Sequence, residues 1–225
     1  MTYGEKIIRF LTGLSLDVPL PEGIEVMNPY LRPEVREGVK AFYSRYYPDE
    51  EPRTFLLGIN PGRFGAGITG ISFTDPIRLE KECGIPNPFD KKQEISSVFI
   101  YDMIRAYGGP EKFYRDFYIT AVCPLGFVKD GKNLNYYDLK ELQEAVTPFI
   151  VETLQTQLDF GANRERAYCV GEGKNFKFLK KLNDEHHFFR KIIPLPHPRF
   201  VMQYRYRKRE EYIRIYLEKL AGKEL

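Results

Sequence analysis

The sequence is poor in cysteine, which occurs only three times in 225 residues, at Cys83, Cys123 and Cys169. An odd number of widely separated cysteines does not fit a disulfide framework, and it offers no paired metal-ligand spacing. We therefore expect ordinary core or near-surface thiols, with no metal and no other cofactor.

Long apolar runs are missing as well. No stretch approaches the length that a bilayer-spanning helix needs, and Glu5 interrupts any interpretation of the first residues as a signal peptide. No internal repeat or low-complexity segment is visible. These absences predict a soluble, cytoplasmic protein that does not bind membranes.

Net charge is small, because 34 basic residues minus 31 acidic residues leave +3. Any affinity for nucleic acid must therefore come from local clustering of basic side chains. A chain of this length with 43% apolar residues can bury one sizeable core. We expect a single domain over residues 1–225.

What the chain does have is a glycine-rich stretch at residues 58–76, directly after the apolar run 54–57, which predicts a buried strand. Glycine permits positive φ and close approach of another molecule to the backbone, so such a loop is typical of a ligand site. Asn60 stands where the strand ends, and ligands bind at the carboxyl ends of strands in α/β sheets. The loop glycines are Gly58, Gly62, Gly65, Gly67 and Gly70.

Two phosphate-binding motifs are excluded at this loop. Residues 65–70 satisfy G-x-G-x-x-G, but that turn should follow its strand immediately and open a helix. Here residues 60–62 intervene, and residues 68–73 are predicted to be loop. Residues 62–67 have the glycine spacing of a P-loop, but Ile68 stands where the phosphate-binding lysine should be.

Apolar periodicity predicts alternating strands and helices along the chain. Strands alternating with helices favour a parallel sheet covered by helices on both faces, which is an α/β fold. Strands are expected at 54–57, 117–122, 167–170 and 191–194. Helices are expected at 5–14, 33–46, 97–107, 136–147, 148–160, after Gly173, and at 204–220, with 16–28 as a surface connection.

Three separate pieces resemble motifs of one known family. They are Gly-Ile-Asn-Pro-Gly at 58–62 with Thr-Gly-Ile-Ser-Phe at 69–73, Cys-Pro-Leu at 123–125, and Pro-Leu-Pro-His-Pro-Arg at 194–199. In this order they resemble the uracil-DNA glycosylase superfamily, closest to its single-strand-selective monofunctional branch. The resemblance implies a three-layer sandwich with a central four-stranded parallel sheet, its first strand in the interior.

The resemblance also implies the chemistry of the site. It places Asn60, Ala121 and His197 at the carboxyl edge of the sheet, with Asn60 holding the attacking water and His197 donating to the base oxygen. An amide can hold a water but has no useful proton affinity, and an imidazole donor stabilises charge that develops only as the bond breaks. From the residues alone, a turn asparagine and a rigid-loop histidine remain alternatives.

Further positions are assigned to base binding by the same resemblance. Phe73 is expected to stack on a flipped base, and an aromatic face accepts any planar base. Ile59 is expected to line the pocket floor, Gly62 to let the backbone approach the substrate, and Phe64 to be a pocket wall or core residue. No lysine lies in the glycine loop to attack C1′, so a monofunctional enzyme that leaves an intact abasic site is expected.

Ala121 is the largest departure from the family. Uracil-specific relatives place an asparagine two residues before the Cys-Pro pair, and here alanine occupies that position. Thr120 should point to the opposite face of its strand and cannot substitute. A site without polar groups for the base edge discriminates weakly, so we expect weak or broadened uracil activity, with xanthine as a further substrate.

Basic and aromatic residues alternate after His197, in a stretch from Arg199 to Arg209 that contains no acid. Such a mixture suits a phosphate backbone and exposed bases, and a solvated helix start is the alternative. By resemblance, the turn that begins at Pro198 wedges into the duplex, although the family usually has Ser-Pro before the arginine. The expected DNA-binding residues are Lys174, Pro198, Arg199, Phe200, Arg205, Arg207 and Lys208.

These observations together predict a monofunctional DNA glycosylase for base excision repair, which removes uracil and/or xanthine. We expect it to act as a monomer whose partner is DNA, associated with the nucleoid. Some branches of the superfamily carry an iron–sulfur cluster, but this chain lacks the four cysteines that such a cluster normally needs. The alternative is a non-catalytic nucleic-acid-binding module with the same fold.

Overall fold

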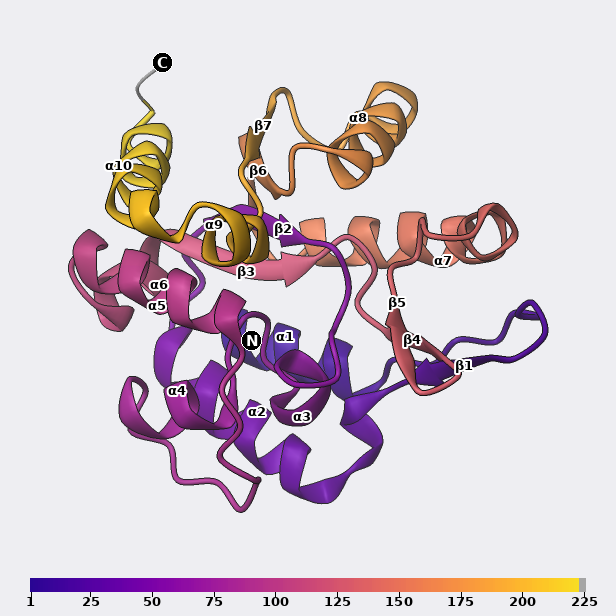
Figure 1. Cartoon of the computed structure of the whole chain (residues 1–225), viewed down its shortest axis with the longest axis horizontal. Coiled ribbons are helices and arrows are strands. Elements are labelled where there is room, and N and C mark those ends of the chain that lie inside the picture. The colour runs from indigo at the N-terminus through magenta and orange to yellow at the C-terminus, as the bar shows by residue number, and fades with distance from the viewer. Residues whose placement is uncertain (223–225) are drawn as a thin grey trace.

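A four-stranded parallel sheet forms the centre of the computed structural model, which describes residues 1–222 (Figure 1). Its strands lie in the order β3 (Phe117–Ala121), β2 (Arg53–Gly58), β6 (Ala162–Val170) and β7 (Ile192–Leu195). Each neighbouring pair is parallel. The predicted three-layer α/β architecture is confirmed, with the first strand of this sheet in its interior.

Side chains that alternate along the strands attach helices to the two faces of the sheet. On one face, the Tyr168 hydroxyl of β6 donates to the Lys219 carbonyl of α10 (Arg209–Leu220) at 2.7 Å. On the other face, the hydroxyls of Tyr118 and Thr120 donate to Gln157 of α7 (Lys140–Leu158). The two-residue period of the strands therefore decides which helix each residue contacts.

Helices expected from periodicity are present close to their predicted positions. They are α1 (Tyr3–Thr12), α2 (Pro33–Tyr46), α5 (Ile95–Tyr107) and α8 (Lys174–His186). Pro33 occupies the first turn of α2, where a missing N–H costs nothing. Three short helices that were not expected also begin with proline, namely η1 (Pro29–Leu31), α4 (Pro76–Lys81) and α6 (Pro110–Asp116).

Helix α7 contradicts the expected break at Pro148. The helix runs through the proline without interruption, and Thr147, the expected N-cap, donates its hydroxyl to the Gln143 carbonyl at 2.6 Å. A proline inside a helix costs about 3 kcal/mol. Burial of a continuous apolar face offsets that cost, through Leu142, Val146, Phe149, Ile150, Leu154 and Leu158.

The expected closing helix at 204–220 is also wrong in its first part. The chain forms α9 (Pro198–Tyr204), a 3₁₀ turn η2 (Tyr206–Lys208), and then α10. Residues after His197 are therefore helical and do not form the turn that the family resemblance implied. Pro198 opens α9 because its fixed φ suits the first helical turn.

The loop predicted at 68–73 holds part of a single helical turn, α3 (Ala66–Thr69). That turn ends at Gly70, whose φ of +73° stops a helix. Its four residues do not provide the helix that a dinucleotide turn opens, so the exclusion of that motif stands.

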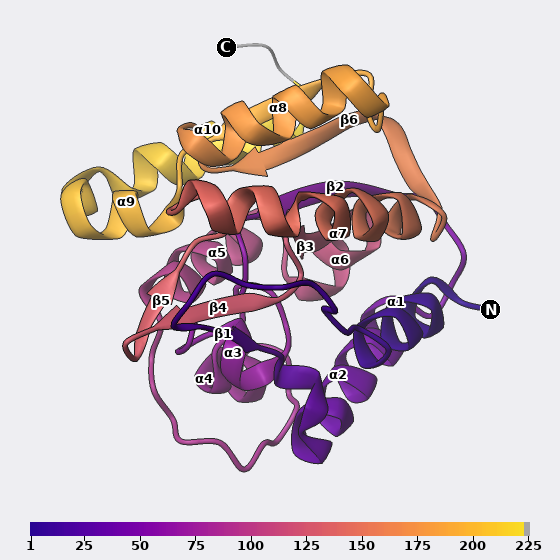
Figure 2. The same ribbon diagram turned by 90° about the vertical axis from the view of Figure 1, so that its right-hand side faces the viewer.

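A small antiparallel sheet is the main feature that the sequence did not predict. Its strands are ordered β1 (Ile24–Met27), β4 (Gly126–Lys129) and β5 (Lys132–Leu134). Met27 of β1 fills the space beside Gly126. A side chain on Gly126 would clash with Met27 and would lie 2.6 Å from the Pro61 carbonyl oxygen. This sheet therefore packs directly against the glycine loop (Figure 2).

Two further structural facts bear on the class of protein. Cys83, Cys123 and Cys169 are all buried and free. Within residues 1–222, no helix combines the length and apolar character needed to cross a bilayer.

Candidate functional site

A cavity of about 440 Å³ opens at the carboxyl ends of β2, β3 and β7. Segments far apart in the chain meet there: the glycine loop after β2, the end of β3, the end of β5 with the residue after it, and α9. The expected site residues that line it are Ile59, Asn60, Gly62, Phe64, Phe73, Ala121, His197, Arg199 and Phe200. Lys174, Pro198, Arg205, Arg207 and Lys208 lie outside this lining.

The side chain of Asn60 is held by the backbone that follows β5. Its Nδ2 donates to the Leu134 carbonyl at 3.1 Å and to the Pro61 carbonyl at 3.4 Å, while its Oδ1 accepts from the Tyr136 N–H at 3.1 Å. Both amide hydrogens are therefore in use, and Oδ1 keeps a second lone pair. The Asn60 side chain ties its own turn to the 134–136 segment and also reaches the cavity.

Tyr136 and Asn175 extend this link into a closed circuit. The Tyr136 hydroxyl donates to Asn175 Oδ1 at 2.7 Å, and Asn175 Nδ2 donates to the Gly58 carbonyl at 3.3 Å. Gly58 lies two residues before Asn60, so the circuit returns to the end of β2. Neither Tyr136 nor Asn175 belongs to a sequence motif. The feature that marks Asn175 in the structure is that its polar side chain is buried in the first turn of α8.

His197 is a neutral hydrogen-bond donor in this geometry. Its Nδ1 accepts from the Arg199 backbone N–H at 3.1 Å, which caps α9 and requires a lone pair on Nδ1. The proton of the neutral ring is therefore on Nε2. Burial, together with the positive charge of Arg199, lowers the pKa of His197 from 6.5 to about 4.

Phe73 occupies a strained position beside the histidine. Its φ of +52° is unusual for a bulky residue, and its ring centroid lies 6.2 Å from that of His197. A side chain on Gly58 would lie 2.9 Å from Phe73 Cε2, so the missing side chain at Gly58 leaves room for the ring. Strain at a ligand-facing position is typical of a functional site.

The wall at Ala121 offers no side-chain hydrogen bond. Ala121 is 6% exposed and lines the cavity. Thr120 also borders it, but the Thr120 hydroxyl donates to Gln157 Oε1 at 2.6 Å on the opposite side of the strand. Strand alternation had predicted this direction for Thr120, and the structure confirms it.

Helix α9 presents exposed aromatic and basic side chains beside the cavity. Phe200 is 42% and Tyr204 68% exposed, and the Arg205 guanidinium lies 5.5 Å from the Phe200 ring centroid. Within residues 1–222, no acid pairs with Arg199, Arg205 or Arg207.

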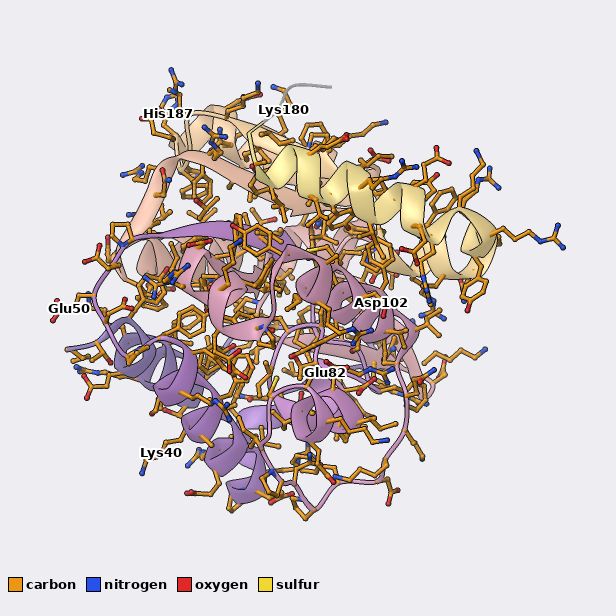
Figure 3. All side chains as sticks on the ribbon, turned by 90° about the vertical axis from the view of Figure 1, so that its left-hand side faces the viewer. Lys40, Glu50, Glu82, Asp102, Lys180 and His187 are labelled. Carbon is orange, nitrogen blue, oxygen red and sulfur yellow. The ribbon has the colours of Figure 1, made fainter. Side chains whose placement is uncertain are left out.

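Acids of α10 and α5 pair with the last cations of the basic stretch. Lys208 pairs with Glu211 at 3.6 Å, and Arg209 pairs with Asp102 of α5 at 3.1 Å (Asp102 is labelled in Figure 3). A stretch without acids in the sequence is therefore partly neutralised in three dimensions. Lys174 is exposed at the first position of α8 and has no ion pair within the described residues.

Comparison with known proteins identifies the family. The model of the Uracil DNA glycosylase superfamily matches residues 44–221, and the chain belongs to this superfamily. The crystal structure of wild-type Pedobacter heparinus SMUG2 superposes with a TM-score of 0.97, at 47% identity over 99% of this chain and 98% of that one. The chain falls within the single-strand selective monofunctional branch of the superfamily.

Two curated relatives carry that branch name. The single-strand selective monofunctional uracil-DNA glycosylase of Rattus norvegicus is 29% identical over 154 residues, which are 60% of this chain and 54% of the relative. That of Mus musculus is 27% identical over 158 residues, 62% of this chain and 55% of the relative. The chain thus spans about half the length of these relatives.

The environment of His197 predicts an acid-sensitive step in stability. Because the folded pKa of about 4 lies below the ordinary value of 6.5, the unfolded chain binds more protons between these pH values. Stability contributed by neutral His197 is complete above pH ~6.5 and is lost as pH falls towards ~4. NMR titration should show a neutral ring with its proton on Nε2 at pH 6. A protonated ring at that pH would contradict the assignment.

Proposed function

We propose that this chain is a monofunctional DNA glycosylase, a single domain acting as a monomer, that hydrolyses the N-glycosidic bond of a deaminated base for base excision repair. Uracil and xanthine are the proposed substrates. The observation that carries the proposal is that His197, whose Nδ1 accepts from the Arg199 backbone N–H, shares one cavity with Asn60 and Phe73. Family membership supports the same reaction class.

The proposed role of His197 is to stabilise the departing base. Glycosidic cleavage leaves negative charge on a base oxygen, and an Nε2–H donor strengthens its hydrogen bond as that charge grows. A neutral ring fits this task because the ring needs no proton from solution at pH 7. Because His197 Nδ1 caps α9, the direction of the ring is fixed before substrate arrives.

The proposed role of Asn60 is to hold the attacking water. Its Oδ1 has one lone pair left after accepting from Tyr136, and a water can donate to that lone pair. The sugar at the transition state resembles an oxocarbenium ion and requires little activation of the nucleophile, so positioning is sufficient. Phe73 would stack on the extruded base beside both groups.

Substitution of Asn60 or His197 by alanine should lower the single-turnover excision rate by ~10²-fold or more, because each removes a positioned hydrogen-bonding group. The assay uses oligonucleotides that carry uracil, xanthine or hypoxanthine, followed by alkali cleavage of abasic sites. Thermal unfolding of each variant shows whether it still folds. Binding of every oligonucleotide without excision by the wild type would instead favour a non-catalytic binding module.

Tyr136→Phe tests whether the circuit positions Asn60. Loss of the hydroxyl leaves Asn175 Oδ1 without its donor, so excision should fall about 3–10-fold while DNA affinity is unchanged, because Asn60 loses part of its support. In an Asn60→Ala background the same change should have no further effect on rate. Tyr137→Phe is the matched control, since no hydrogen bond of its hydroxyl is found within residues 1–222. Equal losses in both backgrounds would assign Tyr136 to folding alone.

Ala121→Asn should increase uracil excision relative to xanthine excision. The new amide would supply donor and acceptor groups for the uracil edge, and its bulk would restrict the space for a purine. The ratio of the two single-turnover rates is the measurement, with Ala121→Val as a control that adds bulk without polarity. Exclusive uracil excision by the wild type would show that another group reads the base.

A further inference from the structure

Exposed aromatic side chains concentrate at the mouth of the cavity. Among the described residues, the large exposed aromatic side chains are Phe64, Phe200, Tyr204 and Tyr206, and the first three line the cavity. Exposed apolar surface that gathers at one place marks a contact site for another molecule. The α9 aromatics belong to the expected DNA-binding stretch, whereas Phe64 was assigned to the pocket wall or core.

Phe64 lies at the rim and is 45% exposed. The Arg63 guanidinium lies 5.1 Å from the Phe64 ring centroid. The Arg63 backbone N–H donates to Asn133 Oδ1 of β5 at 3.1 Å, so a hydrogen bond holds the tip of the glycine loop on the β4–β5 hairpin. This arginine–aromatic pair is therefore supported by a strand.

A second arginine–aromatic pair lies at α9, where Phe200 lines the cavity and Arg205 follows the helix. Arg205 lies over Phe200, whose ring centroid is 5.9 Å from that of Tyr204. Figure 2 shows α9 and β5 projecting on the same side of the molecule, one above the other. Phe64 and Asn133 line the cavity from the glycine loop and β5, and Phe200 and Tyr204 line it from α9.

The rim at Phe64 also has the charge that a nucleic-acid strand requires. No acid pairs with Arg63 or with the exposed Lys132 of the hairpin within residues 1–222. Glu94 is the acid in the cavity lining, and its Oε2 accepts from the Ser97 backbone N–H at 2.9 Å. Arg63 and Lys132 therefore offer positive charge to a phosphate beside a stacked base.

We propose that Arg63 and Phe64 form a second DNA-contact surface, which binds the nucleotide flanking the lesion on one side, while Phe200 and Arg205 bind the nucleotide on the other side. Phe64 stacks on the neighbouring base and Arg63 contacts its phosphate. The proposal rests on the proposed function, because it requires a damaged nucleotide in the cavity between the two surfaces. It therefore places one surface on the 5′ side of the lesion and the other surface on the 3′ side.

Oligonucleotides with a tetrahydrofuran abasic analogue at one end test this placement. One probe extends six nucleotides only on the 5′ side of the analogue, and the other extends only on the 3′ side. Fluorescence anisotropy should show that Phe64→Ala weakens binding of one probe about tenfold and leaves the other unchanged, since loss of one stacked base affects only its own side. Phe200→Ala should show the reverse, and Arg63→Ala should lower the salt slope by about one.

Leu31→Ala is the control, because Leu31 is 70% exposed and lies outside the cavity lining. Equal binding of both probes to Phe64→Ala and wild type would overturn the proposal, as would losses on the same side for both phenylalanine variants. Thermal unfolding should be unchanged in Phe64→Ala because the ring is at the surface. Binding is measured without excision. If the two phenylalanine variants lose binding on opposite sides but the wild type excises no base, only the proposed function is refuted.

Discussion

The hydrogen bonds of the Asn60 side chain determine how the rest of the site is arranged. A parallel sheet brings the carboxyl ends of its strands to one edge, but it does not fix the loops that leave that edge. Here the Asn60 amide joins the turn after β2 to the backbone at Leu134 and Tyr136. Asn133 and Asn175 make comparable links to Arg63 and Gly58. Three asparagines therefore attach the glycine loop to β5 and α8.

Neutral groups are well suited to this arrangement. An ionised side chain in a partly buried cavity would lose hydration that few protein groups could replace. His197 avoids this cost because burial keeps its ring neutral, and Asn60 is neutral at every pH. Both side chains also make hydrogen bonds that set their direction without substrate. The site is thus organised for charge that exists only during the reaction.

The sequence predicted the large parallel sheet because its strands are apolar runs bounded by glycine or proline, as at 54–57 and 191–194. It did not predict β1, β4 and β5, because these short strands form no continuous apolar run and pair only through tertiary contacts. Pro148 was read as a helix boundary because local chemistry cannot show how much apolar surface the folded helix buries. Motifs brought Asn60 and His197 to attention, whereas Tyr136 and Asn175 act through contacts 76 and 117 residues apart in the chain.

The charge that the 199–209 stretch leaves unpaired also depends on contacts that form only in the folded chain. The stretch from Arg199 to Arg209 contains no acid, yet Asp102 and Glu211 pair with Arg209 and Lys208. Arg209 thereby connects the start of α10 to α5. The exposed Lys208–Glu211 pair contributes at most about 1 kcal/mol, whereas Arg209 and Asp102 are partly buried. With Arg209 directed to α5, the positive charge on the α9 side of the cavity is carried by Arg199 and Arg205, adjacent to the aromatic rings of α9.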